Sequence, residues 1–296
     1  MSRIDHALRQ AGMKAPETEA ASQAEMLDSF RFAPDAEVPP AAPAAHTVVA
    51  HAATPIFFER LVVHENAEPI AVEQYRRVAA ILHQSQMDKG NKVVMIASAQ
   101  AKEGKTLTAA NLALTLSESY RRRVLLIDAD LRRPSLNRLF GLPHAAGLSE
   151  SLKAPGDRPL QLLALSPALS LLPGGRADDD PMSGLTSGRM QQIIEKAAAE
   201  FDWVILDTPP VTLLTDAHLL AAMVDSAVLV IGAGSTPCGL VQQAIESIGR
   251  DKIVGVVLNR VEEGALKEAS YDQYYRYATA GKKRELAMSA SREALR

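Results

Sequence analysis

The segment Ser98–Thr106 carries the residues best suited to chemistry, because it reads Ser-Ala-Gln-Ala-Lys-Glu-Gly-Lys-Thr and follows an apolar run. The pattern fits a P-loop in which Ala99 replaces the first glycine. In such a loop, backbone N–H groups and a helix N-terminus bind phosphate, the lysine reaches the β- and γ-phosphates, and the threonine hydroxyl binds Mg²⁺. A glycine-containing turn without a ligand would not explain lysine and threonine directly at the helix start. We therefore expect ATP and Mg²⁺ as ligands, with nucleotide contacts from Gln100, Ala101, Lys102, Glu103, Gly104, Lys105, Thr106 and Leu107.

Two further apolar runs end in carboxylates. Val124–Ile127 leads into Asp128 and Asp130, and Trp203–Leu206 leads into Asp207. Ligands of open α/β sheets bind at the carboxyl ends of the strands, so these side chains should lie near the phosphate loop. Asp207 suits Mg²⁺, which prefers oxygen ligands, and Asp128 and Asp130 could also accept a proton from an attacking hydroxyl. The alternative for each aspartate is a helix cap or turn former, and this alternative has most weight for Asp130.

Short apolar runs alternate with helical stretches after Lys92. Runs that are apolar throughout are expected of strands covered on both faces, and the alternation predicts a parallel sheet with helices on both sides. The fold class is therefore α/β, a doubly wound, mostly parallel sheet of the P-loop NTPase type. The helices Glu68–Met87 and Thr106–Glu118 are expected beside the strands Val93–Ala97, Val124–Ile127, Leu169–Leu172, Trp203–Leu206, Ala227–Ile231 and Ile253–Leu258.

The chain divides into four segments. Residues 1–11 could form a short helix, and residues 12–67 are rich in Ala and Pro, which predicts a disordered, semi-extended linker. We expect the catalytic domain to span residues 68–265 and a tail rich in tyrosine and basic residues to span 266–296. Asp178–Asp180 lies in a Gly- and Pro-rich stretch, and we expect it to be a solvated loop rather than a metal cluster.

Composition and net charge limit the kinds of binding partner and the cellular compartment that we expect. The net charge of −3 gives no reason to expect nucleic acid. The single cysteine, Cys238, excludes a disulfide within the chain and fits a reducing compartment. The sequence contains no apparent signal peptide or transmembrane helix. A cytoplasmic protein is therefore expected.

Four of the six tyrosines lie close together, and Lys282-Lys-Arg284 follows them. A core element is seldom so rich in phenols, because each buried hydroxyl needs a hydrogen-bond partner. A docked amphipathic tail or an aromatic contact patch is the alternative. We interpret the cluster as a set of phosphate acceptors, Tyr271, Tyr274, Tyr275 and Tyr277.

The combined motifs resemble the bacterial tyrosine autokinases of exopolysaccharide operons. The resemblance covers roughly Glu68 to Tyr277, and the N-terminal segment with its Ala/Pro linker is similar to the versions found beside exosortase loci. The motifs that carry it are Glu103–Thr106, Leu126–Pro134, Ile205–Val211 with Thr215–Ala217, Gly147–Leu152, Leu172–Gly175 and Val257–Arg260.

The resemblance implies ATP-dependent phosphorylation of the C-terminal tyrosines, with Asp128 as the base. It implies that Asp128 belongs to the metal site together with Thr106 and Asp207. It also implies that Asn259 lies near the adenine and that Lys105 holds phosphate. It also implies a separate transmembrane polysaccharide co-polymerase as partner, recruitment to the inner face of the membrane, and a homo-oligomer.

Three departures from the family's pattern stand out. Ala101 and Lys102 replace a Pro and a Gly, and Lys102 adds a charge near the phosphates. The family's self-association motif, Glu-x-x-Arg-x-x-Arg, ends here in Ala79. Gln100 occupies the position at which related partition and division-site ATPases carry an extra lysine, which argues against their dimerisation chemistry.

Two other functions compete with the kinase. One is a P-loop ATPase that switches a membrane partner without phosphorylating tyrosine, and it would need no tyrosine cluster. The other is a nucleotide-binding scaffold without catalysis. Intact Lys105, Thr106, Asp128 and Asp207 weigh against the scaffold.

Overall fold

The structure is a computed structural model that describes residues 46–50, 61–62, 69–154 and 159–261 of the chain, with the backbone alone for 46–50. The chain divides into two units, Met1–Asn259 and Arg260–Arg296. The sheet, the helices around it and the candidate site belong to the first unit. The predicted acceptor tyrosines lie outside the described residues, as do the predicted N-terminal helix and most of the predicted linker.

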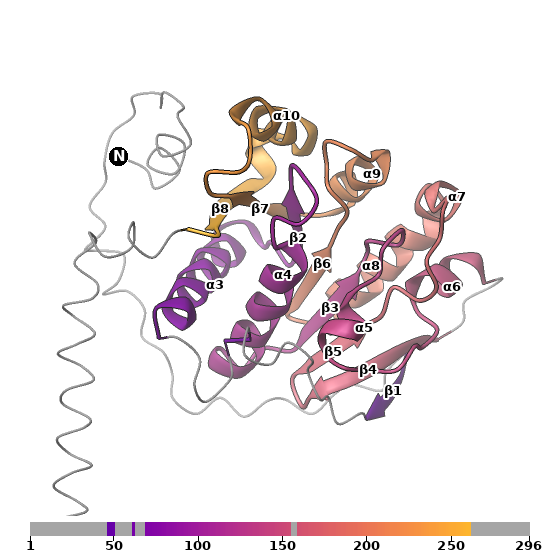
Figure 1. Ribbon diagram of the computed structural model, residues 1–296. Coiled ribbons are helices and arrows are strands. Elements are labelled where there is room, and N and C mark those ends of the chain that lie inside the picture. The colour runs from indigo at the N-terminus through magenta and orange to yellow at the C-terminus, as the bar shows by residue number, and fades with distance from the viewer. Residues whose placement is uncertain (1–45, 51–60, 63–68, 155–158, 262–296) are drawn as a thin grey trace, which may run out of the picture. The chain divides into compact units, whose positions relative to one another are not determined.

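Strands and helices alternate along the described chain (Figure 1). The strands are β1 (His46–Ala50), β2 (Val93–Ser98), β3 (Val124–Asp128), β4 (Leu160–Ser166), β5 (Leu169–Leu172), β6 (Trp203–Asp207), β7 (Ser226–Gly232) and β8 (Ile253–Asn259). The helices are α3 (Pro69–Lys89), α4 (Lys105–Leu114) with its π-helical extension η2 (Thr115–Ser119), α5 (Leu136–Leu139), α6 (Leu148–Lys153), α7 (Met182–Leu185), α8 (Gly188–Glu200), α9 (Thr215–Met223), α10 (Cys238–Ile248) and the 3₁₀ turn η3 (Arg250–Lys252).

The strands form one sheet in the order β1-β4-β5-β3-β6-β2-β7-β8. Every neighbouring pair is parallel except β4 and β5, which are antiparallel. This arrangement confirms the predicted doubly wound, mostly parallel sheet. The strand that precedes the phosphate loop, β2, lies between β6 and β7, so the loop follows an interior strand of the sheet.

Alternate residues of the central strands pack on opposite faces of the sheet. In β2, Met95 belongs to one hydrophobic cluster and Ile96 to the other, as the two-residue period of a strand requires. One cluster contains the apolar faces of α3, α4 and α5, and the other contains those of α6 to α10. In Figure 1, α3 and α4 accordingly lie on one face and α8 and α9 on the other. Coverage of both faces explains why the strand sequences are almost wholly apolar.

Two strands were not predicted. β1 lies inside the segment 12–67, for which the sequence predicted a linker, and it pairs in parallel with β4. Leu61, from the same segment, is buried in the cluster beneath α3. β4 was missed because Pro167 separates it from the predicted strand Leu169–Leu172, whereas the structure places the proline in the tight connection between the antiparallel strands β4 and β5.

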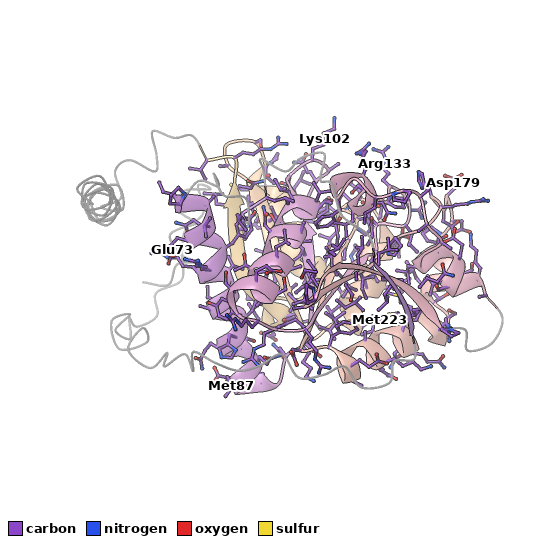
Figure 2. The ribbon with its side chains drawn as sticks, turned by 90° about the horizontal axis from the view of Figure 1, so that it is seen from below. Glu73, Met87, Lys102, Arg133, Asp179 and Met223 are labelled. Atoms are coloured by element: carbon purple, nitrogen blue, oxygen red, sulfur yellow. The ribbon has the colours of Figure 1, made fainter. Side chains whose placement is uncertain are left out.

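The carboxyl ends of the parallel strands define one edge of the domain. Figure 2 shows Lys102, Arg133 and Asp179 along this edge and Met87 away from it. Met87 belongs to the last turns of α3, shortly before β2 begins. Among the helices that the structure describes, none has both the length and the apolar character needed to cross a bilayer.

Candidate nucleotide-binding site

The phosphate loop runs from the end of β2 to the start of α4. Gly104 caps the helix with φ 100°, in the left-handed region that favours glycine. A Cβ atom on Gly104 would lie 2.1 Å from the Asn259 side-chain nitrogen, so it would displace the Asn259 amide from the loop. Lys102 adopts φ 67° as well, although it is not a glycine. The loop therefore has the strand–loop–helix setting and the sharp turn that a phosphate cradle needs.

Three hydrogen bonds anchor the first half of this loop. The Ser98 hydroxyl donates to the Gln100 carbonyl at 2.7 Å, and the Val211 N–H donates to the Ser98 carbonyl at 3.0 Å. The Thr212 hydroxyl donates to the Ala99 carbonyl at 2.6 Å. The segment after β6 thus holds the loop that follows β2, which fixes the phosphate loop relative to Asp207.

Asp128 and Asp207 are register partners at the ends of β3 and β6. Both are buried, with 1% and 0% of their surface exposed. Asp128 Oδ2 accepts the N–H groups of Ser135 and Leu136 at 2.8 and 2.9 Å, whereas its Oδ1 has no hydrogen-bond partner. Neither carboxylate oxygen of Asp207 has one. Three carboxylate oxygens therefore remain available in a buried site.

The protonation of this pair follows from its surroundings. Burial first, and then the charge of Asp207, raises the pKa of Asp128 to about 8. Burial raises the pKa of Asp207 to about 7, although the nearby Thr106 hydroxyl and the Lys105 ammonium lower it. Burial also raises the pKa of Asp130, and Lys105 opposes that shift. A cation placed between these carboxylates would favour their charged forms.

The residues present fit Mg²⁺. Hard cations prefer oxygen ligands, and the unpartnered oxygens of Asp128 and Asp207 are accompanied by the Thr106 hydroxyl, which lies 3.4 Å from that of Ser135. Within the described ranges, no set of three or more His, Cys, Asp and Glu side chains could hold a metal ion. The site therefore suits a cation that is completed by water and phosphate oxygens, as Mg²⁺ usually is.

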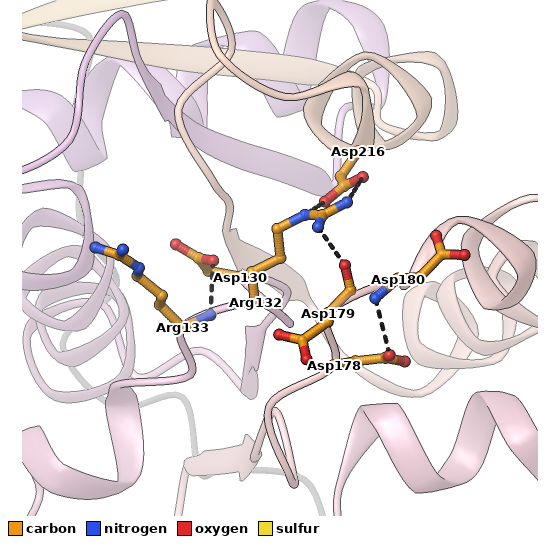
Figure 3. A network of polar contacts seen from close by, with 7 residues as sticks. All are labelled: Asp130, Arg132, Arg133, Asp178, Asp179, Asp180 and Asp216. Carbon is orange, nitrogen blue, oxygen red and sulfur yellow. Dashed lines mark hydrogen bonds and ion pairs between the residues drawn. The ribbon is translucent and has the colours of Figure 1, made fainter.

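Arg132 joins three segments beside the carboxylates (Figure 3). Its guanidinium forms a two-pronged ion pair with Asp216 at the start of α9, at 2.6 and 3.2 Å, and donates to the Asp179 carbonyl at 2.5 Å. The Asp178 N–H donates to the Leu131 carbonyl at 2.9 Å. This network fixes the β3–α5 loop, which carries Asp130 and the N–H donors to Asp128.

The other predicted site residues occupy varied positions. Ala101 is exposed at the loop, and Leu107 packs partly against the hydrophobic cluster beneath α3. The Asn259 side chain donates to the Glu103 carbonyl at 2.8 Å, so it lies at the phosphate loop, and its predicted role beside adenine stays a prediction. Sequence reasoning did not assign roles to Arg132 and Asp216, although both lie within motifs that carry the family resemblance.

Helix α3 carries the incomplete self-association motif. Glu73 and Arg76 form an ion pair at 3.9 Å on the helix surface. Ala79 is completely buried in the cluster that α3 shares with α4. Position 79 therefore faces the domain's own core, where an alanine fits and an arginine would have to bury its charge.

The fold and the site together define a nucleotide-binding P-loop protein. Residues 94–287 match the family model described as the CobQ/CobB/MinD/ParA nucleotide binding domain. Over 210 residues, the chain is 34% identical to the tyrosine-protein kinase YwqD of Bacillus subtilis, covering 70% of this chain and 86% of that protein. This chain belongs to the family of bacterial tyrosine-protein kinases.

Two further comparisons agree with this assignment. The chain is 30% identical to the tyrosine-protein kinase wzc of Salmonella typhi over 223 residues, which cover 73% of this chain and 31% of that longer protein. The kinase domain of the Escherichia coli tyrosine kinase ETK superposes with a TM-score of 0.63 at 29% identity, covering 72% of this chain and 84% of that one. The exosortase-associated subtype is not tested by these comparisons and stays a prediction.

Proposed function

We propose that this chain is an ATP-dependent protein-tyrosine kinase that phosphorylates its own C-terminal cluster, Tyr271, Tyr274, Tyr275 and Tyr277. The observation that carries the proposal is the meeting of the phosphate loop with Asp128 and Asp207, whose buried carboxylates have unpartnered oxygens. Membership of the tyrosine-kinase family supports tyrosine as the acceptor over ATP hydrolysis alone.

The arrangement supports direct transfer with Asp128 as the base. Its Oδ2 is held by two backbone N–H groups, which leaves Oδ1 to accept a proton. The proton of the tyrosine hydroxyl passes to Oδ1 while the phenolic oxygen bonds to the γ-phosphorus. The bond from that phosphorus to the β–γ bridging oxygen breaks, and ADP leaves.

The remaining residues position and neutralise the phosphates. Lys105 and the backbone N–H groups of the loop hold the β- and γ-phosphates. Mg²⁺, held by the Thr106 hydroxyl and by the carboxylate oxygens of Asp207, with Asp128 contributing through a water molecule, would supply charge neutralisation at the phosphate oxygens. Lys105 is only 7% exposed, so its ammonium acts in a site from which most water is excluded.

The acceptor tail is presented by a neighbouring copy, and the kinase regulates exopolysaccharide polymerisation or export together with a separate transmembrane partner. Each phosphate adds roughly −1.5 to −2 charge, so four add about −6 to −8 to the tail. Such a charge would release the tail from a site rich in carboxylates. Comparing the oligomer size before and after dephosphorylation tests this release, and an unchanged size would contradict it.

Incubation of the purified protein with ATP and Mg²⁺, followed by peptide mass spectrometry, tests the activity. Phosphate is expected on residues 271–277 and should disappear in Lys105→Met. Tyr75 and Tyr120 are internal controls, because the Tyr120 hydroxyl donates to the Arg76 carbonyl and Tyr75 lies in α3, and neither should be modified. Steady ATP hydrolysis without phosphotyrosine, even with the partner's cytoplasmic segment added, would favour the ATPase switch.

A further inference from the structure

Glu103 places a buried negative charge inside a loop that is built to bind phosphate, with only 4% of its surface exposed. We infer that Glu103 is a positioning residue whose carboxylate ties the phosphate loop to the β7–α10 turn, and that this tie sets the affinity for the nucleotide. The inference rests on the nucleotide-binding part of the proposed function and is independent of which residue accepts the phosphate.

Both carboxylate oxygens of Glu103 are engaged. Oε2 accepts the N–H of Gln100 at 2.7 Å, across the phosphate loop itself. Oε1 accepts the Thr236 hydroxyl and, at 3.4 Å, the N–H of Gly232. The side chain therefore connects the loop after β2 to the turn after β7, more than a hundred residues further along the chain.

These contacts separate Glu103 from the catalytic carboxylates. Asp128 keeps one unpartnered oxygen and Asp207 keeps two, which suits a base and metal ligands. Glu103 has no such oxygen, so it is suited to neither role. Hydrogen bonds from two N–H groups and a hydroxyl stabilise its charge, and they hold the carboxylate on the β7–α10 turn instead of on the bound phosphates.

Hydrogen bonds within the β7–α10 turn hold Thr236 in the position from which it contacts Glu103. Gly232 donates its N–H to the Thr236 hydroxyl at 3.0 Å, and the Thr236 N–H donates back to the Gly232 carbonyl at 3.1 Å. A Cβ atom on Gly232 would lie 2.4 Å from the Ser235 hydroxyl, so a larger residue would require that hydroxyl to rotate away from the turn. The Thr236 hydroxyl thus reaches Glu103 from a defined position.

The end of strand β8 contacts both the phosphate loop and the residue that follows β7. The Asn259 side chain, at the end of β8, donates to the Glu103 carbonyl at 2.8 Å. The Asn259 carbonyl in turn accepts the N–H of Ala233, the first residue after β7, at 2.8 Å. The phosphate loop is therefore held through the Glu103 side chain by β7 and through the Glu103 backbone by β8.

The contacts that join the phosphate loop to the β7–α10 turn and to β8 should affect nucleotide binding more than they affect folding. A loop that is already shaped for the triphosphate loses little conformational freedom when the ligand arrives. A loop that is released from the turn would populate the competent shape only part of the time, and the apparent dissociation constant would rise in proportion. The effect should be the same for ATP and ADP, because both place phosphates in the same loop.

The experiment compares Thr236→Val, which removes the hydroxyl but keeps the shape, with Thr236→Ser, which keeps the hydroxyl. Dissociation constants for ATP and ADP with Mg²⁺ are measured by calorimetry on the full chain. Thr236→Val should weaken both nucleotides by about tenfold, the effect of losing one hydrogen bond to a charged group, and should leave kcat at saturating ATP within about twofold. Thr236→Ser should bind like the wild type.

Amide hydrogen exchange of residues 100–106 in the nucleotide-free protein gives a second readout, and exchange should be faster in Thr236→Val. Glu103→Gln should also weaken both nucleotides, because both oxygens of Glu103 accept hydrogen bonds and glutamine has only one acceptor oxygen. The double variant should be no weaker than either single variant. Thr186→Val is the matched control, since the Thr186 hydroxyl bonds only within the segment of α7.

Wild-type affinity and unchanged exchange in Thr236→Val would overturn the inference. Equal losses in Thr236→Ser and Thr236→Val would do so too, because they would assign the effect to packing of the methyl group. Additive losses in the double variant would show that the two side chains do not act through one contact. The affinities and the exchange rates do not depend on tyrosine phosphorylation, so a failed kinase assay would leave these two tests intact.

Discussion

Asp207 and Asp216 lie at opposite ends of the segment between β6 and α9 and are almost equally buried, at 0% and 2% exposure. Asp216 has both oxygens bound by the Arg132 guanidinium, whereas neither oxygen of Asp207 has a hydrogen-bond partner. A buried charge without a partner costs free energy, and a paired one costs much less. Asp216 therefore has its charge satisfied within the chain, whereas Asp207 is arranged to bind a ligand.

The largest expected effect comes from Asp207→Asn. Phosphoryl transfer should fall by at least about a hundredfold, because a charge that neutralises the phosphates through the metal is lost. Near pH 7 the metal-free protein should nevertheless gain up to about 4 kcal/mol of unfolding free energy, because a neutral amide replaces a buried carboxylate whose pKa is raised from its ordinary value to about 7. Kinetic assays and urea unfolding with a chelator measure the two quantities. Loss of both activity and stability would mean that Asp207 supports the fold instead.

Asp216→Asn should give the opposite pattern. The unfolding free energy should fall by about 2 kcal/mol, which is less than for a fully buried ion pair because the Arg132 side chain is 30% exposed. The affinity for ATP should change little, because the pair joins the β3–α5 loop to α9 and is not part of the phosphate loop. Arg132→Met is the companion variant, and urea unfolding should find it more damaging than Asp216→Asn, because it leaves a buried carboxylate without its partner, whereas Asp216→Asn leaves a partly exposed guanidinium that water can reach. A stability change near zero for Asp216→Asn would contradict the comparison.

The fold and the reactive part of the site were predictable because they depend on local patterns. Apolar runs, the glycine before Lys105, and the aspartates that end β3 and β6 can all be recognised in short segments. The pair of Arg132 and Asp216 joins residues that are 84 positions apart, and one sequence contains no signal for such a pairing.

Glu103 illustrates the same limit inside a predicted motif. Its position in the loop predicted a nucleotide contact, but the direction of its side chain depends on Thr236, 133 positions away. β1 was missed for a related reason. His46–Ala50 contains two valines and a threonine with strand propensity, but its Ala- and Pro-rich surroundings resemble a linker, and the strand exists through its pairing with β4.

The dependence of stability on pH tests whether the buried carboxylates of Asp128 and Asp207 lack partners, and the expected effect is smaller. The pKa values of Asp128 and Asp207 are raised in the folded protein, to about 8 and about 7, so the unfolded chain loses these protons at lower pH than the folded one. Their contribution to stability is therefore fully present below about pH 4 and is lost as the pH rises toward 8. The difference in unfolding free energy between metal-free Asp207→Asn and the metal-free wild type should grow between pH 5 and pH 8. A constant difference would contradict the raised pKa values.

The smallest expected effect concerns the backbone of the phosphate loop. Lys102 holds φ 67°, a conformation that costs a residue with a Cβ atom about 1–2 kcal/mol and costs glycine much less. Lys102→Gly should therefore raise the unfolding free energy by roughly 0.5–1 kcal/mol, after allowance for the greater freedom of glycine in the unfolded chain. Lys102→Ala removes the same charge but keeps the strain, so it should not stabilise the protein. If thermal melts show that both variants are equally stabilised, the gain comes from the lost charge and the left-handed backbone of Lys102 carries no measurable strain.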